Sequence, residues 1–413
     1  MPYDDLTKLF HKDASSDRYR ANEEKARERL LAESTFRTGI VFDGGELFLA
    51  TPRELSVVFE RVLRRERKVS AELKQLPSIA CGAFIRNLII DEVVGSNGIE
   101  GVRSTRRQVS DALDEVRHGG ASNTMQAKRF MEFAKLYLGL SEKTSAMPRT
   151  PEDIRAIYDK VMSGEDLGGN APDGRLFRKD PVDIVDGREK VVHTGVNPET
   201  RIIEMMEAML ALQESEEVPA LYSAVMAHYV FEAVHPFYDG NGRTGRYLLA
   251  LALSAPLSIS TALSLSRVIA ENKEPYYRAF KNVQMPMNHG ELTFFVIRML
   301  EYILEAQARN MESLEFGQDQ MKAAGDAAGA ALTAGYVNDR EADLLFQFAQ
   351  VQLFAWTPEV LLADAASYLQ LTKQMARKHL TTLEEKGLIE RISQRPLKFQ
   401  LSREGQALMG LKR

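Results

Sequence analysis

Residues 235–246 read HPFYDGNGRTGR, and this stretch decides how the rest of the chain is interpreted. It combines an imidazole, a carboxylate, a Gly-Asn-Gly turn and two arginines, which core packing does not require. Residues 221–234 (LYSAVMAHYVFEAV) are apolar with helical spacing, and Pro236 ends that helix because proline breaks the backbone ladder. Residues 246–253 (RYLLALAL) indicate a second buried helix. The stretch is therefore predicted to be a tight loop between two core helices, ending on the first turn of the second.

The backbone and the arginines of this loop suit an anion. Gly240 and Gly242 allow successive N–H groups to converge, and a helix beginning at residues 241–243 adds its positive dipole end. Arg243 and Arg246 are three residues apart, so both can direct forked donors at phosphates from one helical face.

Two further side chains supply chemistry. Asp239 offers hard oxygens of the kind that Mg²⁺ prefers when it bridges the phosphates of a nucleotide. His235 stands at the edge of the loop, where a neutral imidazole can take a proton from an incoming hydroxyl. Together the residues predict attack of a hydroxyl on a metal-bound nucleotide phosphate.

The string resembles, at every defined position, the H-P-F-x-[DE]-G-N-G-R-x-x-R signature of the Fic family of AMP-transferases. The resemblance implies transfer of AMP from ATP to a Ser, Thr or Tyr hydroxyl of a protein. The related death-on-curing branch phosphorylates instead and typically carries Ala and Lys where this chain has Gly240 and Gly242, which favours nucleotidyl transfer here. By position, the resemblance implies that His235 is the general base and that Asp239 is the Mg²⁺ ligand. It implies that backbone amides around Gly240 and Gly242 hold the α-phosphate, with Asn241 in support, and that Arg243 and Arg246 bind the β- and γ-phosphates. Phe237 would anchor the loop in the core.

Residues 96–101 (SNGIEG) fit the family's [ST]-x-x-x-E-[GN] inhibitory motif through Ser96, Glu100 and Gly101. In similar proteins the glutamate reaches into the nucleotide site and pairs with the second arginine of the signature, here Arg246. A carboxylate on that arginine would displace the γ-phosphate and leave ATP in an unproductive pose. Taken alone, Glu100 also fits an ordinary surface carboxylate at the end of a helix.

Two other elements fit the same site. Residues 182–194 (VDIVDGREKVVHT) alternate and contain Asp-Gly, which predicts a β-hairpin. Similar proteins place a hairpin flap beside the catalytic loop, where it clamps an extended target segment; an ordinary surface hairpin is the alternative. Tyr276 and Tyr277 resemble the family's paired tyrosines next to the adenine pocket, with a paired core contact as the alternative.

The other histidines carry no chemistry in this reading. The chain has 7 histidines, and only His235 lies in a chemical constellation. His228 lies two helical turns earlier on the same face, and no cysteine or carboxylate completes a tetrahedral metal site, so we expect it to be packed in the core. His193 is expected to be a solvent-exposed strand residue.

Composition narrows the class of protein. With 53 basic and 58 acidic residues among 413, the net charge of −5 argues against a protein covered by nucleic acid. The single Cys81 rules out an internal disulfide and fits a reducing cytoplasm. The N-terminus lacks the apolar core of a signal peptide, and the apolar run 247–264 is interrupted by Pro256, which favours a buried helix and loop. We expect a soluble cytoplasmic protein with no membrane partner.

Breaks in the pattern divide the chain into three expected domains. Residues 1–140 form an N-terminal, mainly helical region that carries the inhibitory motif. Within this region a short hairpin is expected at 41–50, before the helical part. Residues 141–320 form the catalytic core, and 336–413 form a C-terminal domain. The Ala- and Gly-rich residues 321–336 predict an exposed helix that frays into a linker. The expected fold is mainly α, a Fic-type helical bundle with a β-hairpin flap plus a winged helix-turn-helix.

The C-terminal domain has its own pattern of elements. They are a helix at 361–369, a turn at 370–372 with Thr372 as N-cap, a helix at 373–386 ended by Gly387, and strands at 388–392 and 397–401. This order is typical of a winged helix-turn-helix. From Lys373 onward the tail has ten basic and four acidic residues, and Gln374, Arg377 and Lys378 would face outward to read DNA. A packing or dimerisation domain is the alternative.

Three functions remain open at this point. The first is an autoinhibited protein adenylyltransferase that uses ATP and Mg²⁺ on a target protein, or on itself. The second is a nucleotide-sensing DNA-binding transcriptional regulator. The third is the reverse enzyme, which removes AMP from a modified protein with Glu100 positioning water. The residues identify no target and leave open whether the protein is a homodimer.

Overall fold

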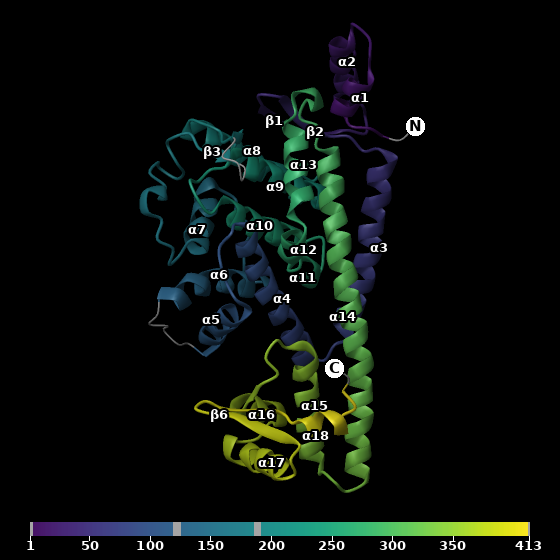
Figure 1. The fold of residues 1–413 in the computed structure, drawn as a ribbon, viewed down its shortest axis with the longest axis vertical. Coiled ribbons are helices and arrows are strands. Elements are labelled where there is room, and N and C mark those ends of the chain that lie inside the picture. The colour runs from purple at the N-terminus through teal and green to yellow at the C-terminus, as the bar shows by residue number, and fades with distance from the viewer. Residues whose placement is uncertain (1–2, 119–124, 186–190, 412–413) are drawn as a thin grey trace. The chain divides into compact units, whose positions relative to one another are not determined.

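The protein is mainly helical, as predicted (Figure 1). The structure, a computed structural model, describes residues 3–118, 125–185 and 191–411. Within these residues the strands form three small sheets, two of two strands and one of three. No helix in this described part of the chain is long and apolar enough to cross a bilayer.

The chain forms two compact units, each assembled from two separate stretches. The first unit comprises Met1–Arg67 and Ile89–Gln307, and the second comprises Lys68–Leu88 and Ala308–Arg413. The units are discontinuous because three helices contribute to both of them: α3 (Arg53–Gln75), α4 (Ser78–Ile99) and α14 (Thr293–Thr333). The bounds of these units differ from those of the three continuous domains expected from the sequence, and that division stays a prediction.

Helices dominate the first unit. Those that lie wholly within it are α1 (Leu6–Lys12), α2 (Arg18–Leu30), α5 (Arg106–His118), α6 (Met125–Ser141), α7 (Pro151–Val161), α8 (Glu199–Glu214), α9 (Ala220–Val234), α10 (Asn241–Leu253), α11 (Ile259–Ala262), α12 (Leu265–Glu271) and α13 (Lys273–Gln284), with short 3-10 turns η1 (Gly168–Asn170) and η2 (Pro286–Asn288). Two antiparallel hairpins complete it, β1 (Phe36–Phe42) with β2 (Gly45–Leu49) and β3 (Asp183–Val185) with β4 (Val191–Thr194). The hairpin predicted at 41–50 therefore begins earlier than expected, at Phe36.

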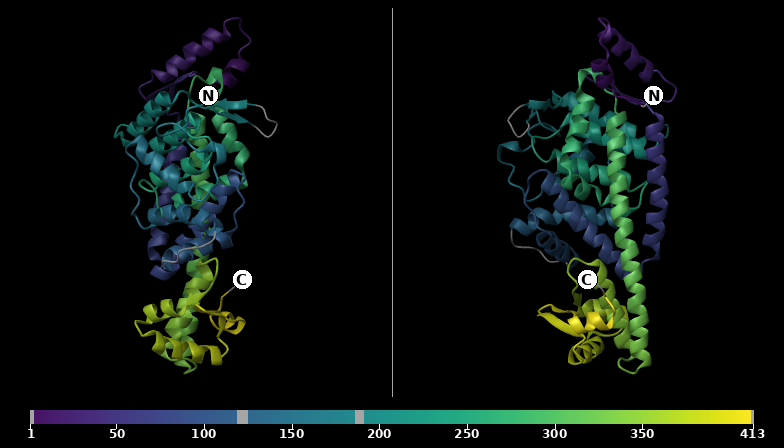
Figure 2. Two further views of the ribbon diagram at one scale, coloured as in Figure 1. Left: turned by 90° about the vertical axis from the view of Figure 1, so that its left-hand side faces the viewer. Right: turned by 45° about the vertical axis from the view of Figure 1, so that its right-hand side comes forward.

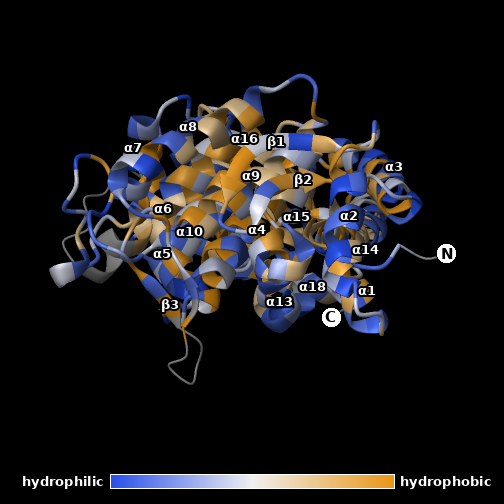
Figure 3. Cartoon of the chain, turned by 90° about the horizontal axis from the view of Figure 1, so that it is seen from above, coloured by the Kyte–Doolittle hydropathy of each residue, from blue (hydrophilic) through white to orange (hydrophobic). Residues whose placement is uncertain are grey.

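The core of the first unit is built around α9 and α10. Every residue of α9 from Leu221 to Val234 is buried except Glu232, and all 13 residues of α10 are buried. Helices that are apolar on all sides are stable only when they are enclosed, and α9 packs between α8 and α10. Figure 3 shows the hydrophobic colouring of α9. Both predicted core helices are confirmed, so the loop between them starts and ends in the protein interior.

The second unit ends in a helical and three-stranded segment. Its elements are α15 (Asp339–Phe354), β5 (Val360–Leu361), α16 (Leu362–Leu369), α17 (Lys373–Glu385), β6 (Ile389–Gln394), β7 (Leu397–Leu401) and α18 (Arg403–Leu408). The strands pair antiparallel in the order β5-β7-β6. Thr372 caps α17 by accepting a hydrogen bond from the Met375 N–H (3.3 Å), and Gly387 follows the helix at φ +71°. The predicted helices and strands of this segment are thus present.

One prediction about this unit is wrong. Residues 321–336 are not an exposed helix that frays into a linker, because α14 continues unbroken to Thr333 (Figure 2). Ala324, Ala328 and Ala331 are buried in one hydrophobic cluster with α15. Alanines at helical spacing let a second helix approach closely, and composition alone does not reveal that a partner covers them.

Candidate active site

His235 is held where α9 ends. Its backbone is left-handed (φ 54°, ψ 63°), and its N–H still bonds to the Phe231 carbonyl (3.0 Å). The fully buried Arg178 donates to the His235 carbonyl (2.8 Å) and to the Val196 carbonyl (2.7 Å). A cation at a helix C-terminus satisfies carbonyls that have no partner within the helix. Arg178 therefore fixes the backbone of His235; sequence reasoning missed it because a lone arginine carries no pattern.

The imidazole of His235 is set up to accept a proton. Its Nδ1 lies 3.3 Å from the Glu232 carbonyl, and because a carbonyl only accepts, Nδ1 carries the hydrogen. The lone pair is therefore on Nε2. Enclosure by the protein is the main cause that lowers the pKa of His235 to about 4, so the ring is neutral at physiological pH.

Phe237 and Asn241 brace the loop. The Phe237 ring has no exposed surface and stacks on Tyr158, with 3.6 Å between ring centroids. The Asn241 side chain accepts from the Phe237 N–H (2.9 Å) and donates to the Phe237 carbonyl (2.7 Å). Asn241 thus supports the loop by closing it on itself.

The first turn of α10 presents backbone N–H groups that lie outside the helical ladder. Its first intrahelical bond runs from the Thr244 N–H to the Gly240 carbonyl (3.0 Å), so the amides of residues 241–243 precede the helical ladder. Gly240 has a φ of 82°, which glycine adopts without strain. Amides in this position form an anion site together with the helix dipole.

Asp239 is the candidate metal ligand. It is exposed, and its Oδ1 accepts from the Gly240 N–H (2.6 Å). The described part of the chain holds no group of three or more His, Cys, Asp or Glu that would form a metal cage. A single carboxylate fits Mg²⁺ that takes its other ligands from phosphate oxygens and water, as is usual in nucleotide sites.

The segment 96–101, predicted to be an inhibitory motif, meets the second arginine of the loop. Arg246 pairs with Glu100 (Nη2 to Oε1, 2.9 Å) and donates to the Ser96 hydroxyl (3.0 Å) and carbonyl (2.9 Å). The Glu100 carboxylate fills the space where a Cβ on Gly242 would lie, so it covers the first turn of α10. Gly101, at φ +73°, turns the chain away after the motif. Ser96 and Glu100 are thus brought to Arg246 and to the anion site.

The first arginine of the loop is also occupied. Arg243 pairs with Glu165 (Nη1 to Oε1, 2.6 Å), and both side chains are nearly enclosed. Sequence reasoning missed Glu165, since its loop after α7 has no recognisable motif. Both arginines therefore have carboxylate partners in this conformation.

The two tyrosines have different surroundings. Tyr276 is buried and donates to His228 Nε2 (2.8 Å), because His228 Nδ1–H is used on the Gly245 carbonyl (3.2 Å). Burial lowers the pKa of His228 to about 3, so this histidine is a neutral core residue, as expected. Tyr277 is about half exposed (48%) and donates to the Ile99 carbonyl (3.4 Å) at the end of α4. A nucleotide role for the pair stays a prediction.

The predicted flap forms a hairpin beside His235. Strands β3 and β4 pair with Ile184 opposite His193, while the Asp-Gly turn at 186–187 lies outside the described residues. His193 is not the solvent-exposed residue that we expected: it is half-buried and its Nε2 donates to the Ala233 carbonyl (2.6 Å). The prediction is wrong because β4 packs against the end of α9.

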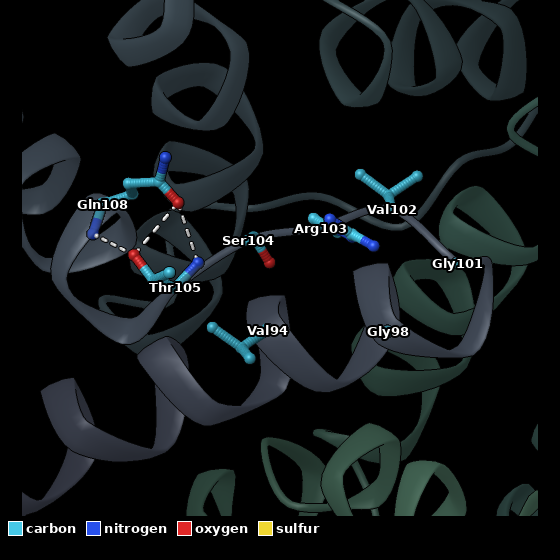
Figure 4. Close-up of a pocket in the computed structure, with 8 residues that line it drawn as sticks. All are labelled: Val94, Gly98, Gly101, Val102, Arg103, Ser104, Thr105 and Gln108. Carbon is cyan, nitrogen blue, oxygen red and sulfur yellow. Dashed lines mark hydrogen bonds between the residues drawn. The ribbon is translucent and has the colours of Figure 1, made fainter.

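A hollow adjoins the segment 96–101, the predicted inhibitory motif. It has a volume of about 750 Å³ and is lined by Val94 and Gly98 of α4, the loop 101–105 and Gln108 of α5 (Figure 4). In the same loop Thr105 caps α5, since its hydroxyl accepts from the Gln108 N–H (3.2 Å). The segment that follows Glu100 therefore leads into an ordered helix start.

Comparison with known proteins finds similarity over the segment that contains the loop. A model of the Fic/DOC family matches residues 148–253. A probable protein adenylyltransferase from Aquifex aeolicus is 25% identical over 207 residues, which cover 49% of this chain and 57% of that protein. Protein adenylyltransferase Fic from Drosophila ananassae is 29% identical over 154 residues, covering 37% and 29% of the two chains. The match thus spans less than two thirds of either relative.

A solved structure extends the likeness over most of the chain. The crystal structure of a Fic family protein from Desulfovibrio desulfuricans G20 is similar with a TM-score of 0.53 and 22% identity, and covers 86% of this chain and 98% of that one. At this identity the likeness concerns the fold alone. The expected mainly helical, Fic-like fold is therefore confirmed.

Proposed function

We propose that this protein, in which residues 148–253 match a model of the Fic/DOC family, is a protein adenylyltransferase held inactive by its own Glu100. The observation that carries the proposal is the ion pair between Glu100 and Arg246 (2.9 Å), which lies over the amides of the first turn of α10. The names of the distant relatives support the reaction class.

The reaction is an in-line displacement at the α-phosphorus of ATP. The oxygen of a Ser, Thr or Tyr hydroxyl on the target forms a bond to that phosphorus, and the bond from the phosphorus to the bridging oxygen breaks. Pyrophosphate leaves with the electron pair. The hydroxyl proton passes to His235 Nε2, whose lone pair is free because Nδ1–H is held by the Glu232 carbonyl.

The triphosphate would be bound by the backbone and arginine donors of this loop once Glu100 has moved away. The amides of residues 241–243 would receive the α-phosphate, where they stabilise the charge that develops in the transition state. Arg243 and Arg246 would bind the β- and γ-phosphates with forked donors. Asp239 would hold Mg²⁺, which neutralises phosphate charge when bound.

Glu100 opposes this binding by charge and by position. Its carboxylate occupies the arginine that the γ-phosphate needs, and it lies against Gly242 in the anion site. Two anions that share one cation at close range repel each other strongly where water is excluded. ATP therefore binds productively only after Glu100 has left Arg246.

The test is Glu100→Gly, assayed with ATP labelled on its α-phosphate. We expect incorporation of label into the protein or into a cell lysate to rise about tenfold or more, since each 1.4 kcal/mol of competing ion-pair energy corresponds to a factor of ten. Glu142→Gly removes an exposed glutamate beyond α6 and is the matched control, with no change expected.

The base is tested in the same background. Adding His235→Ala to Glu100→Gly should abolish labelling while ATP is still retained, because the phosphate donors are intact. Labelling by Glu100→Gly no greater than that of the wild type, with ATP shown to bind, would contradict the inhibitory role of Glu100. Equal labelling with and without His235 would contradict its role as the base.

We propose a second function, DNA binding, for the end of the second unit. The order α15, β5, α16, α17, β6, β7 suits a winged helix-turn-helix, in which the second helix enters the major groove. The side chains of Gln374, Arg377 and Lys378 on α17 are all exposed, which supports a contact with phosphates or bases.

A further inference from the structure

Glu232 is the only Asp, Glu, Lys or Arg side chain of α9, and the mechanism above does not use it. The residue as a whole is half-buried, but its Oε1 is enclosed and has no hydrogen-bond partner among the residues that the structure describes. That oxygen fills the space where a Cβ on Gly245 would lie. The glycine one residue before Arg246 therefore leaves room for this carboxyl in the core.

Charged and titratable groups face Glu232 from three other elements. They are Arg246 of α10, Glu100 at the end of α4, and Tyr276 with Tyr277 of α13. Arg246 is ion-paired to Glu100 rather than to Glu232. Enclosure is the main cause that raises the pKa of Glu232 to about 8; Arg246 opposes the rise and Glu100 adds to it. With Glu100 in place, Glu232 therefore holds a proton at neutral pH.

We propose that Glu232 is a positioning residue for Arg246, which ionises when Glu100 leaves and takes up a proton again when a γ-phosphate binds. This inference rests on the proposed function, because it needs a phosphate to replace Glu100. Departure of Glu100 removes one negative charge and leaves Arg246 without a countercharge. The Glu232 carboxyl then releases its proton to solvent and keeps the guanidinium at the site.

The direction of the pH effect follows from the charges. Glu232 binds its proton more tightly while Glu100 is present than after Glu100 has left. Release of Glu100 is thus accompanied by loss of a proton, and rising pH favours release up to the inhibited-state pKa of about 8. Binding of the γ-phosphate restores the negative charge and reverses the proton movement.

The experiment measures protons rather than catalysis. MgATP is titrated into the full-length Glu100→Gly protein by calorimetry at about pH 7.5, in two buffers of different ionisation enthalpy. We expect uptake of a measurable fraction of a proton per ATP bound. Glu232→Gln keeps the volume of the side chain but removes its titratable carboxyl. When it is added to Glu100→Gly, the proton uptake per ATP bound should fall at least threefold. Glu142→Gln in the same background should leave it unchanged.

The outcomes separate this inference from the proposed function. ATP binding with the same proton uptake in the Glu232→Gln variant overturns the role of Glu232 and leaves the proposed function standing. Absence of any ATP binding by Glu100→Gly overturns both. If Glu232→Gln does not fold, a pH series on Glu100→Gly alone decides. Uptake must shrink at about pH 9.5, well above the inhibited-state pKa of about 8, because the Glu232 carboxyl then stays ionised whether or not ATP is bound. Uptake that is constant from neutral pH to there overturns the inference.

Discussion

His235 combines a strained, left-handed backbone with a neutral imidazole ring. Neighbouring residues stabilise the backbone conformation and fix the position of the ring proton. The left-handed conformation is stabilised by Arg178, whose guanidinium binds the carbonyls at the end of α9. The proton on Nδ1 is fixed by the Glu232 carbonyl. A base of low pKa is a weaker base, but it is present in its active form over a wider range of pH.

The pH dependence of AMP transfer tests this description. In Glu100→Gly at saturating MgATP, kcat should stay nearly constant from about pH 7.5 down to about pH 5.5, because a histidine of pKa about 4 stays neutral there. A histidine of ordinary pKa, about 6.5, would lose roughly tenfold at the lower end. The measurement is initial rate of label transfer across the series, with circular dichroism to verify folding at each pH. A half-loss of kcat near the ordinary value would contradict the low pKa.

Among single residues, the sequence predicted those of the loop 235–246 but missed the side chains from elsewhere that hold the loop in place. Residues of the signature are contiguous, so a pattern of types at fixed spacing identifies them. Arg178 and Glu165 come from other segments, and only the fold brings them to the loop. Glu232 could have been noticed in the sequence, because it is a carboxylate in an otherwise apolar helix. The burial of His193 left none, because it depends on how β4 meets α9.

The helix α4, which ends next to Glu100, is positioned by close packing on α12. A Cβ on Gly95 would lie 2.8 Å from the backbone N of Arg267, so the two helices touch at that glycine. Three residues earlier, the Glu92 carboxylate accepts from the Ser266 N–H (2.9 Å) and hydroxyl (2.5 Å), which caps the first turn of α12. These contacts determine how far the end of α4 reaches toward Arg246.

Gly95→Ala should therefore weaken inhibition. The added methyl group has no room and must push α4 away from α12, which we expect to cost about 1–3 kcal/mol of stability and to raise basal AMP transfer. Gly98→Ala is the matched control, since a Cβ there meets nothing within 4 Å. Urea unfolding and label incorporation are measured on both variants. Equal behaviour of the two would mean that the contact at Gly95 does not hold the inhibitory helix in place.

The periodicity of apolar residues predicted a helix correctly where the helix's own sequence shows its buried positions and its caps. It identified α9, α10, α16 and α17, because apolar spacing and caps are local properties. It failed for the last turns of α14, where alanine and glycine indicated exposure although α15 covers them. Small residues have little apolar surface of their own, so their burial depends on a partner that the local sequence does not contain.

At the scale of the whole molecule, the candidate catalytic residues and the inhibitory motif all belong to the first unit, and the exposed basic helix α17 belongs to the second. The discontinuity of both units was not predictable, since it arises from long helices that contribute to each. The overall composition shows a nearly neutral chain, and only the positions of the charged residues along the sequence show that the tail from residue 373 onward is basic.

Arg377→Ala tests the second unit without touching the first. If α17 contacts DNA, its affinity for a duplex in a gel-shift assay at low salt should weaken by about 1–3 kcal/mol, or roughly 5- to 150-fold. Label transfer in the Glu100→Gly background should be unchanged. Arg340→Ala, on α15, is the control for loss of a positive charge in the same unit. Undiminished retention of DNA by Arg377→Ala would favour a domain that contacts protein.

The close contact of α4 with α12 also limits how the chain can vary. Between Gly95 and Glu100 the helix is continuous, so inserting or deleting one residue there would swing the glutamate by about 100° around the helix axis, away from Arg246. Many side chains along α4 can therefore be exchanged without moving Glu100, whereas a change in the length of the helix at that point would remove the proposed inhibition in a single step.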